Sequence, residues 1–393
     1  MYNISKSEWQ KLKKYGHVEV GNNKNYAVEG LYYGGDKIVE ESLNKQFILP
    51  FSIENIIDAG IKQLSEEKIK LKNAEHIANE IREALRNGKG YSLVRIGDGE
   101  LIFLSHDLIN SSEEINKEPR LQFLSYAGVT LPDHETRDFL TEKLLLTNVI
   151  GVPIARYPTF QNLFIKLVNY HNWNLKKMNV TSSFIHFELC RYTTLYHELL
   201  QHHRVLLIGN KMNEGRKYFE DIGYENIVGN VPVFGVKDVS NVITRAKEYE
   251  YDVVFVSAGI AANLICVELA QEGKIAIDFG HLIDSLINDK AHILSLDSNL
   301  LDVSKCSDIG YYYVNWGDYK TAAYWYEQIL KMENLSSEWM KIAHLQLCVC
   351  HWELHDLQKA NEHNEYAETY APNDPSVLHN KAFFKDILKN NEG

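Results

Sequence analysis

The sequence has no long apolar run. None approaches the roughly 18 consecutive apolar residues that a membrane-spanning helix needs, so no membrane span is predicted. The first residues, Met-Tyr-Asn-Ile-Ser-Lys, lead into polar sequence, unlike a secretory signal peptide. Cysteine is also scarce, with five residues, an odd number in no framework spacing. Such a cysteine pattern indicates a reducing compartment, and we expect a cytoplasmic protein.

Blocks of basic residues are missing as well. The formal net charge is −12, from 41 Lys and Arg against 53 Asp and Glu. Because binding to a phosphate backbone needs clustered cations, the composition argues against nucleic acid as a partner. A small anionic ligand needs only a local site and stays compatible with this charge. The 393 residues, 45% of them apolar, predict a globular protein of two or three domains.

Three regions of the chain differ in pattern. Residues 1–50 are polar, aromatic and dotted with glycine, and we expect an irregular extension there. Residues 51–300 alternate apolar runs of strand length with segments of helical periodicity. This alternation predicts an α/β domain with a mostly parallel sheet and helices on both faces. Residues 305–393 have a helical pattern throughout, which predicts an all-α domain.

The periodicity and the turn residues place the elements of the α/β domain. Strands are predicted at 91–96, 149–154, 204–209, 226–234, 252–257 and 274–278. Helices are predicted at 74–85, 101–109, 160–170, 215–221, 239–249 and 261–271.

The last region contains an approximate internal repeat. The stretch from Asn315 to Ala322 recurs from Glu353 to Ala360, and Pro372 and Pro375 precede a final helix. This pattern resembles tetratricopeptide repeats, helical hairpins with a small residue at the close approach and Ala at the packing contact. Such repeats stack into a surface that binds peptides, so we expect a protein partner or an acceptor to bind there.

An apolar run ends in a glycine-flanked pair of carboxylates, Asp98 and Glu100. Gly97 and Gly99 permit a turn on which both carboxylates can converge on one hard cation. On a regular helix the two side chains would point about 200° apart, so this interpretation requires a turn. In the alternative, Asp98 caps the next helix and Glu100 complements its dipole.

Three other predicted strands end in residues that suit a ligand. A turn of small residues at the start of a helix offers backbone N–H groups to a phosphate. Neither a Gly-x-Gly-x-x-Gly fingerprint nor a Walker sequence is present, so dinucleotide and P-loop sites lack their signatures. The candidate residues at these strand ends are Gly209, Ser257, Ala258, Gly259, Asp278 and His281.

Taken in order, these segments resemble the bacterial GT-D glycosyltransferase family. Its members have an Arg-Phe/Ile-Gly-Asp-Gly-Glu stretch, found here from Arg95 to Glu100. They also have a Gly-x-x-Ala-Ile-Asp-Ile-Gly-His stretch, found here with one change from Gly273 to His281. The resemblance covers roughly residues 75–290. It implies a Rossmann-like sheet of the GT-D type and a nucleotide-sugar donor, with a UDP-sugar as the leading expectation.

The resemblance also implies roles for the candidate residues. Asp98 and Glu100 would hold Mn²⁺ or Mg²⁺ against the departing diphosphate. A base must take the proton of the acceptor hydroxyl, and Asp278, His281 or one of the two motif carboxylates can do so. The residues expected to bind the donor are Arg95, Gly97, Gly99, Gly209, Ser257, Ala258 and Gly259.

The predicted function is therefore glycosyl transfer to a protein or glycoprotein, with the C-terminal repeats aiding acceptor or partner binding. One alternative is a nucleotide-sugar or sugar-phosphate hydrolase that uses the same carboxylates and needs no acceptor. The other is a non-catalytic repeat scaffold, which would ignore nucleotide sugars.

Overall fold

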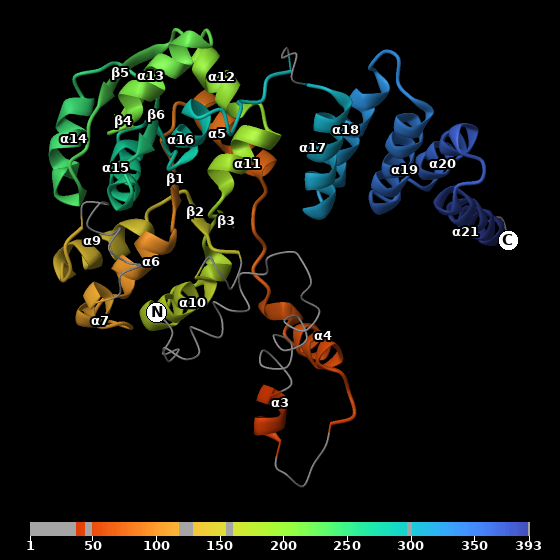
Figure 1. The fold of residues 1–393 in the computed structure, drawn as a ribbon, viewed down its shortest axis with the longest axis horizontal. Coiled ribbons are helices and arrows are strands. Elements are labelled where there is room, and N and C mark those ends of the chain that lie inside the picture. Colours follow the sequence, from red (N-terminus) through yellow and green to blue (C-terminus); the bar gives the residue numbers. More distant parts are fainter. Residues whose placement is uncertain (1–36, 44–48, 118–128, 155–159, 297–300, 392–393) are drawn as a thin grey trace. The chain divides into compact units, whose positions relative to one another are not determined.

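The computed structural model describes residues 37–43, 49–117, 129–154, 160–296 and 301–391 (Figure 1). The chain divides into two compact units, one of residues 1–70 with 165–176 and one of residues 71–164 with 177–393. The predicted irregular extension, residues 1–50, lies mostly outside the described residues. Its described part contains a helix, α3 (Lys37–Ser42), and the first unit continues with α4 (Ile53–Gln63) and the 3₁₀ turn η2 (Ser65–Glu67).

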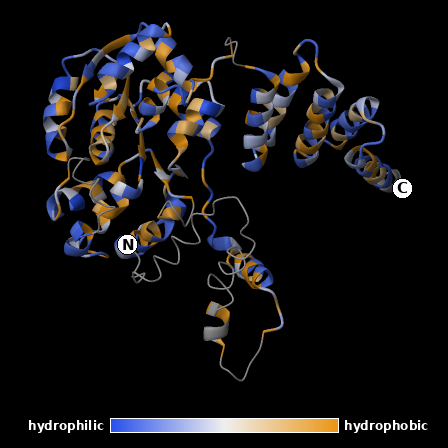
Figure 2. Ribbon diagram, in the orientation of Figure 1, coloured by the Kyte–Doolittle hydropathy of each residue, from blue (hydrophilic) through white to orange (hydrophobic). Residues whose placement is uncertain are grey.

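Seven strands form one parallel sheet in the order β3-β2-β1-β7-β6-β4-β5. Figure 2 shows that these strands are mostly hydrophobic, and most of their residues are buried. The prediction of a mostly parallel α/β sheet is confirmed. The strands are β1 (Tyr91–Arg95), β2 (Val149–Val152), β3 (Val180–Ser182), β4 (Val205–Gly209), β5 (Ile227–Val231), β6 (Val253–Ser257) and β7 (Ile275–Asp278).

The strand order brings the four candidate strand ends together. Strands β1, β7, β6 and β4 are consecutive neighbours, and every pair is parallel. In register, Leu93 lies opposite Ile277, and Phe255 lies between Ile277 and Leu207. All four carboxyl ends therefore lie at one edge of the sheet, where ligands of open α/β sheets bind.

Helices cover both faces of the sheet, as predicted. On one face a single apolar core joins the strands to five helices. They are α5 (Ala74–Arg86), α11 (Ile185–Tyr192), α12 (Leu195–His202), α13 (Met212–Asp221) and α16 (Leu282–Ile287). On the other face α15 (Ile260–Gln271) packs on β1, β6 and β7, and α9 (His134–Leu144) and α14 (Val239–Ala246) pack on α15.

The remaining elements of this unit are α6 (Asp98–Ser105), α7 (Ser112–Lys117) and the 3₁₀ turn η5 (Val236–Asp238). Helix α10 (Gln161–His171) and the 3₁₀ turn η4 (Leu175–Lys177) are divided between the two units, with most of their residues in the first. Within the described ranges, no helix has both the length and the apolar character that crossing a bilayer requires. All five cysteines are unpaired and buried.

The C-terminal region is all-helical, as predicted. Its helices are α17 (Val303–Asn315), α18 (Tyr319–Leu330), α19 (Ser337–Glu353), α20 (Leu357–Tyr370) and α21 (Pro375–Asn391), each packed on the next. The two loops that the repeat aligns have the same conformation, because Gly317 and His355 both adopt positive φ, 67° and 61°. Ala322 and Ala360 are fully buried. The arrangement is that of two helical hairpins and a final helix, and its assignment to tetratricopeptide repeats stays a prediction.

Helix α17 is part of the packing of the α/β domain. The Tyr312 hydroxyl donates to Glu188 of α11 at 2.6 Å, and the Tyr312 ring stacks on Tyr192 with centroids 3.9 Å apart. The Tyr313 hydroxyl donates to the carbonyl of Tyr192 at 2.9 Å. The tyrosine before them, Tyr311, is instead 60% exposed. The C-terminal helices therefore share buried contacts with the sheet domain through α17.

Three histidines meet between α19 and α20. The Nδ1 atoms of His344 and His363 lie 3.0 Å apart, and the rings of His351 and His363 stack with centroids 5.3 Å apart. Burial lowers the pKa of all three imidazoles. Together with the neighbouring His344 and His351, burial brings the pKa of His363 down to about 4. The interface is therefore uncharged at neutral pH.

We expect the protein to lose stability as the pH falls from about 6.5, the pKa of an unfolded histidine, toward 4. Over this range the histidines of the unfolded chain bind protons, whereas the three histidines of the folded interface stay neutral. Acid therefore favours unfolding. His363→Gln should reduce this loss, whereas His379→Gln, at an exposed position of α21, should not. Melting temperatures of the full chain at pH 7, 6 and 5 test this, and the same pH slope in all three proteins would contradict it.

Candidate active site

The segment 97–100 is the first turn of a helix rather than a separate turn. Helix α6 begins at Asp98, three residues before the predicted start, because Glu100 accepts the N–H of Gly97 through Oε2 at 2.9 Å. The helix ends at Ser105, and Asp107 has a φ of 53°. The expectation of a non-helical turn is therefore wrong, because the contact between Glu100 and the N–H of Gly97 extends the helix back to Asp98. In the alternative Asp98 would cap the helix, but the N-cap is Gly97 and Asp98 is the first helical residue.

Asp98 and Glu100 have different surroundings. Asp98 is exposed, and its Oδ1 accepts the N–H of Gly99 at 2.9 Å. Burial, followed by the nearby charge of Asp278, raises the pKa of Glu100 to about 7. Each carboxylate uses one oxygen in these bonds, and within the described residues the other oxygen has no hydrogen bond. Both keep an oxygen of the kind that Mg²⁺ or Mn²⁺ prefers.

The guanidinium of Arg95, at the end of β1, holds together the ends of neighbouring strands. Its Nη2 donates to Oδ1 of Asp278 at 3.0 Å, and its Nε donates to the Asp278 carbonyl at 3.3 Å. Its Nη1 donates to the carbonyl of Ser183 at 3.2 Å and lies 3.3 Å from Nε2 of His186. Each nitrogen of the guanidinium is thus engaged by the protein, and the expected contact of Arg95 with a phosphate stays a prediction.

Asp278 and His186 are both buried beside this guanidinium, at 4% and 3% exposure. Burial raises the pKa of Asp278, while Arg95 acts in the opposite direction. Burial, followed by the charge of Arg95, lowers the pKa of His186 well below its usual value. A neutral His186 can therefore accept a hydrogen bond from Arg95 through Nε2. His186 was not among the predicted residues, because the strand before it, β3, has only three residues.

Two glycines leave room for Arg95. A Cβ atom at Gly280, where φ is 49°, would lie 1.9 Å from Nη2 of Arg95. A Cβ atom at Gly151 of β2 would lie 3.0 Å from Cγ of Arg95. The position of the guanidinium therefore depends on the absence of side chains on both sides.

We expect Gly280→Ala to destabilise the fold much more than Gly273→Ala. Both glycines have positive φ, so each substitution costs roughly 1–2 kcal/mol of backbone strain. Only Gly280 faces an obstacle, because no atom lies within 4 Å of a Cβ placed at Gly273. Displacing Arg95, whose side chain is 15% exposed and paired with the buried Asp278, should add about 3 kcal/mol or more. Urea unfolding of both variants measures the difference, and equal losses would show that Arg95 moves aside freely.

The ends of β4 and β6 lie against each other and against β7. Gly209 has a φ of 144°, and a Cβ there would lie 2.2 Å from the carbonyl oxygen of Ser257. The Ser257 hydroxyl donates to the carbonyl of Gly280 at 2.7 Å. Ala258 is half-buried and Gly259 exposed, and Gly259 (φ 53°, ψ −135°) leads into α15 without any side-chain cap. The predicted small-residue turn therefore ends at an uncapped helix N-terminus.

His281 is on the outside of this group, with its side chain 90% exposed. Its Nδ1 lies 3.3 Å from Oδ2 of Asp284, in the first turn of α16. Asp284 also pairs with Lys211 at the end of β4. Although burial opposes it, these two partners lower the pKa of Asp284. Asp284 was not among the predicted site residues, although its spacing from His281 is that of neighbours on a helix.

The predicted residues therefore separate into two layers. Arg95 and Asp278 form a buried pair, and Glu100 lies close enough for their charges to affect its pKa. Asp98 and His281 are open to solvent.

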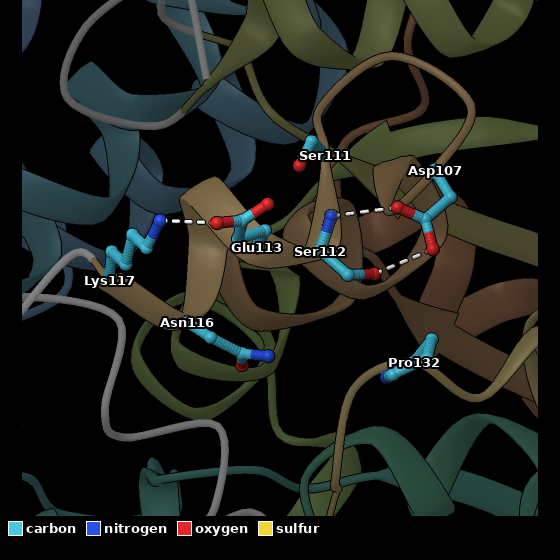
Figure 3. A pocket seen from close by; sticks show the side chains of 7 residues that line it. All are labelled: Asp107, Ser111, Ser112, Glu113, Asn116, Lys117 and Pro132. Atoms are coloured by element: carbon cyan, nitrogen blue, oxygen red, sulfur yellow. Dashed lines mark hydrogen bonds and ion pairs between the residues drawn. The ribbon is translucent and has the colours of Figure 1, made fainter.

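A second site lies beyond α6, at a pocket of about 580 Å³ (Figure 3). Asp107 accepts hydrogen bonds there from the N–H and the hydroxyl of Ser112, both at 2.7 Å. None of the predicted site residues lines it. The lining residues are Asp107, Ser111, Ser112, Glu113, Asn116, Lys117 and Pro132.

Beside this pocket, His106, Asp107 and His134 form a group of side chains that could hold a metal ion. His134 Nε2 lies 2.7 Å from Oδ2 of Asp107. The ring of His106 is already engaged at both nitrogens, since Nε2 accepts the N–H of Asp133 at 3.1 Å and Nδ1 contacts the carbonyl of Phe103. A metal ion at His106 would have to displace the contact with Asp133.

Residues 72–286, more than half of the chain, match the family model GT-D-like, described as a GT-D fold-like domain. Two solved structures of a domain of unknown function 1792, one described as having a distinct glycosyltransferase fold, show a weaker likeness. They are 18% and 19% identical, with TM-scores of 0.36 and 0.37, and cover 58% of this chain and 83% of theirs. No curated protein matches the chain.

Proposed function

Since the chain belongs to the GT-D-like family and is a glycosyltransferase, we propose that its donor is a nucleoside-diphosphate sugar, with UDP as the leading nucleotide. The acceptor that we propose is a hydroxyl group of a protein or glycoprotein. The observation that carries the proposal is the adjacency of β1, β7, β6 and β4, which gathers the candidate strand ends at one edge of the sheet.

On the donor side, the start of α15 suits a diphosphate. The first N–H groups of a helix have no intrahelical partner, and α15 has no side-chain cap to satisfy them. The helix dipole favours an anion at the same point. Ala258 and Gly259, which precede the helix, leave space for phosphate oxygens to come close. We assign the diphosphate to this turn.

We assign a divalent cation to Asp98, whose carboxylate is exposed at the strand-end edge. Because Asp98 and Glu100 lie in the same turn of α6 and point about 200° apart, Glu100 is not a second ligand of that cation. A carboxylate oxygen is a hard ligand of the type that Mn²⁺ and Mg²⁺ bind. A cation bound there would neutralise charge on the leaving diphosphate. Arg95 then has a positioning role, because its ion pair fixes the side chain of Asp278, whose charge acts on Glu100.

His281 is the base that we favour. The acceptor hydroxyl passes its proton to Nε2 of His281 while its oxygen bonds to the anomeric carbon, and the bond to the diphosphate breaks with its electron pair leaving on the phosphate. Asp284 lies at Nδ1 of His281, on the other side of the ring, where it can hold the ring in orientation. Asp278, the alternative, is buried and bonded to Arg95.

The acceptor surface that we propose lies on the C-terminal helices. Trp352 and Phe383 are 38% and 40% exposed and pack together with ring centroids 4.9 Å apart. Trp352 lines a groove of about 270 Å³ with Glu353, His355, Leu357 and Ile387. Exposed aromatic rings beside polar groups bind both peptides and sugars through their apolar faces.

We expect Trp352→Ala to raise the KM for the natural acceptor about tenfold, because binding energy remote from the reacting centre is lost. Slow hydrolysis of the donor without acceptor should not change. Tyr324→Ala is the control, since Tyr324 is 43% exposed but lies outside the groove. Steady-state kinetics of both variants measure the effect, and an unchanged KM in Trp352→Ala would remove the groove from the acceptor site.

The proposed function is tested with the purified full chain and a panel of nucleotide sugars, with and without Mn²⁺. One donor should raise the melting temperature and be hydrolysed slowly, and a protein acceptor should accelerate its turnover. Release of free sugar at the full rate without acceptor would favour the hydrolase alternative. Binding of no nucleotide sugar would favour the scaffold.

A further inference from the structure

One buried side chain near the strand ends has no hydrogen-bond partner. Asn263 of α15 is 1% exposed, and neither its Oδ1 nor its Nδ2 has a partner among the described residues. The great majority of buried polar groups in proteins are paired, because an unpaired one loses its hydration without compensation. An amide with both atoms unpaired points to a partner that is bound only part of the time.

The position of Asn263 relates it to the proposed diphosphate site. It lies four residues after Gly259, one turn into a helix whose N-terminus has no side-chain cap and whose first residues, Ile260 and Ala261, are buried. Side chains on a helix lean toward its N-terminus, so the Asn263 amide leans toward the Gly259 turn. The N-terminus of α15, which has no side-chain cap, is the second feature here that lacks partners.

The same stretch of α15 faces the end of β7. Helix α15 packs on β1, β6 and β7, the strands that end in Arg95, Ser257 and Asp278. Burial, followed by the charge of Asp278, raises the pKa of Cys266, which lies one turn beyond Asn263. Along the helix, Asn263 therefore lies between the uncapped start of α15 and Cys266, whose pKa responds to Asp278.

We propose that Asn263 is a donor-binding residue that bonds a hydroxyl group of the sugar ring next to the diphosphate. The inference rests on the proposed function, and it adds a residue that recognises the donor. An amide offers one acceptor and a donor group, and a hydroxyl complements it by donating and accepting at once. One helical turn rises about 5.4 Å, which matches the step from a phosphate to the ring attached to it. The ring enters at the exposed Gly259, the turn residue without a side chain.

Stability and binding should move in opposite directions when Asn263 is replaced. Asn263→Leu removes an unpaired buried amide, so the melting temperature of the free protein should rise by about 2 °C or more. The dissociation constant for the donor should increase about tenfold. A residue with only a structural role would not produce this combination. Asn263→Ala provides a second test in case leucine does not fit, with the same loss of binding expected.

The experiment uses the full chain with Mn²⁺ and four probes: UDP, UDP-glucose, UDP-galactose and UDP-N-acetylglucosamine. Calorimetric titration gives the affinities and a thermal scan gives the stability. A loss for the UDP-sugars alone assigns the amide to the transferred sugar, and an equal loss for UDP assigns it to the ribose. Both outcomes support the proposal. Tyr196→Phe is the control, because it removes another unpaired buried group without an expected change in binding.

Three results would overturn the proposal. In the first, Asn263→Leu binds every probe as the wild type does, so the amide is satisfied by internal water only. In the second, the melting temperature falls, which means that the amide is already paired in the free protein. In the third, the wild-type chain binds none of the four probes, in which case the proposed UDP-sugar donor fails and this inference fails with it.

Discussion

Asp98→Ala is expected to lower the rate of sugar transfer by about two orders of magnitude or more while the protein stays folded. Asp98 is exposed and its only hydrogen bond among the described residues is to the N–H of Gly99, so the fold loses little. The reaction loses a ligand of the cation that we assign to the leaving diphosphate. Initial rates with saturating donor and Mn²⁺ give the effect, and circular dichroism confirms the fold.

The matched control for Asp98 is Glu135→Ala. Glu135 is also an exposed acid in the first turn of a helix, α9, so it shares the dipole contribution but not the strand end. It should keep the transfer rate of the wild type. Glu100→Gln extends the test, because glutamine can still accept the N–H of Gly97 while it loses the charge. If Asp98→Ala and Glu100→Gln both transfer sugar at near-normal rates, the two acids serve only to start α6.

Arg95→Met is expected to reduce the free energy of unfolding by about 3–5 kcal/mol. The guanidinium and Asp278 form a pair at 3.0 Å, with side chains only 15% and 6% exposed. Removing the cation leaves a buried carboxylate without its partner, while Ser183 loses a donor. Urea unfolding at pH 7 measures the loss, and a change below 1 kcal/mol would show that solvent reaches Asp278 easily.

Two further variants test whether the loss of stability comes from breaking the buried charge pair or from removing any arginine. Arg95→Met combined with Asp278→Asn should recover part of the stability, because the unpaired charge is then gone. Arg216→Met breaks a surface pair with Glu220, whose side chains are 39% and 47% exposed. It should cost no more than about 0.5 kcal/mol. A similar loss in Arg95→Met and Arg216→Met would contradict a buried, structural pair.

The sheet could be predicted from the sequence because its strands are continuous apolar runs. A strand of a parallel sheet is buried on both faces, so successive residues are apolar. The predicted strand at 252–257 accordingly differs from β6 by one residue. Strand β3 was not predicted, since Val180–Ser182 has only three residues and two of them are polar. The strand order could not be predicted either, because it depends on the insertion of β6 and β7 between β1 and β4.

The candidate site could be predicted only in part, for a similar reason. Local patterns pointed to Asp98, Glu100 and Asp278 as candidates, which lie at the end of a strand or within five residues after one. They did not identify His186, whose contact with Arg95 spans 91 positions of the chain. The patterns also predicted the start of α6 three residues after its actual start at Asp98, because the capping contact of Glu100 depends on one side-chain rotamer. Contacts between distant segments and single rotamers are set by packing, which no short pattern encodes.

Helix α11 has a consequence for how this protein could exchange parts with its relatives. Its eight residues include His186, which touches Arg95, and Glu188, which accepts from Tyr312 of α17. A chimera that joins a foreign C-terminal segment before residue 303 would leave the half-buried Glu188 without the hydroxyl of Tyr312, two positions from His186, which contacts Arg95. Recombination should therefore be tolerated better between α18 and α19. The first hairpin, α17 and α18, is therefore expected to be inherited together with the sheet domain.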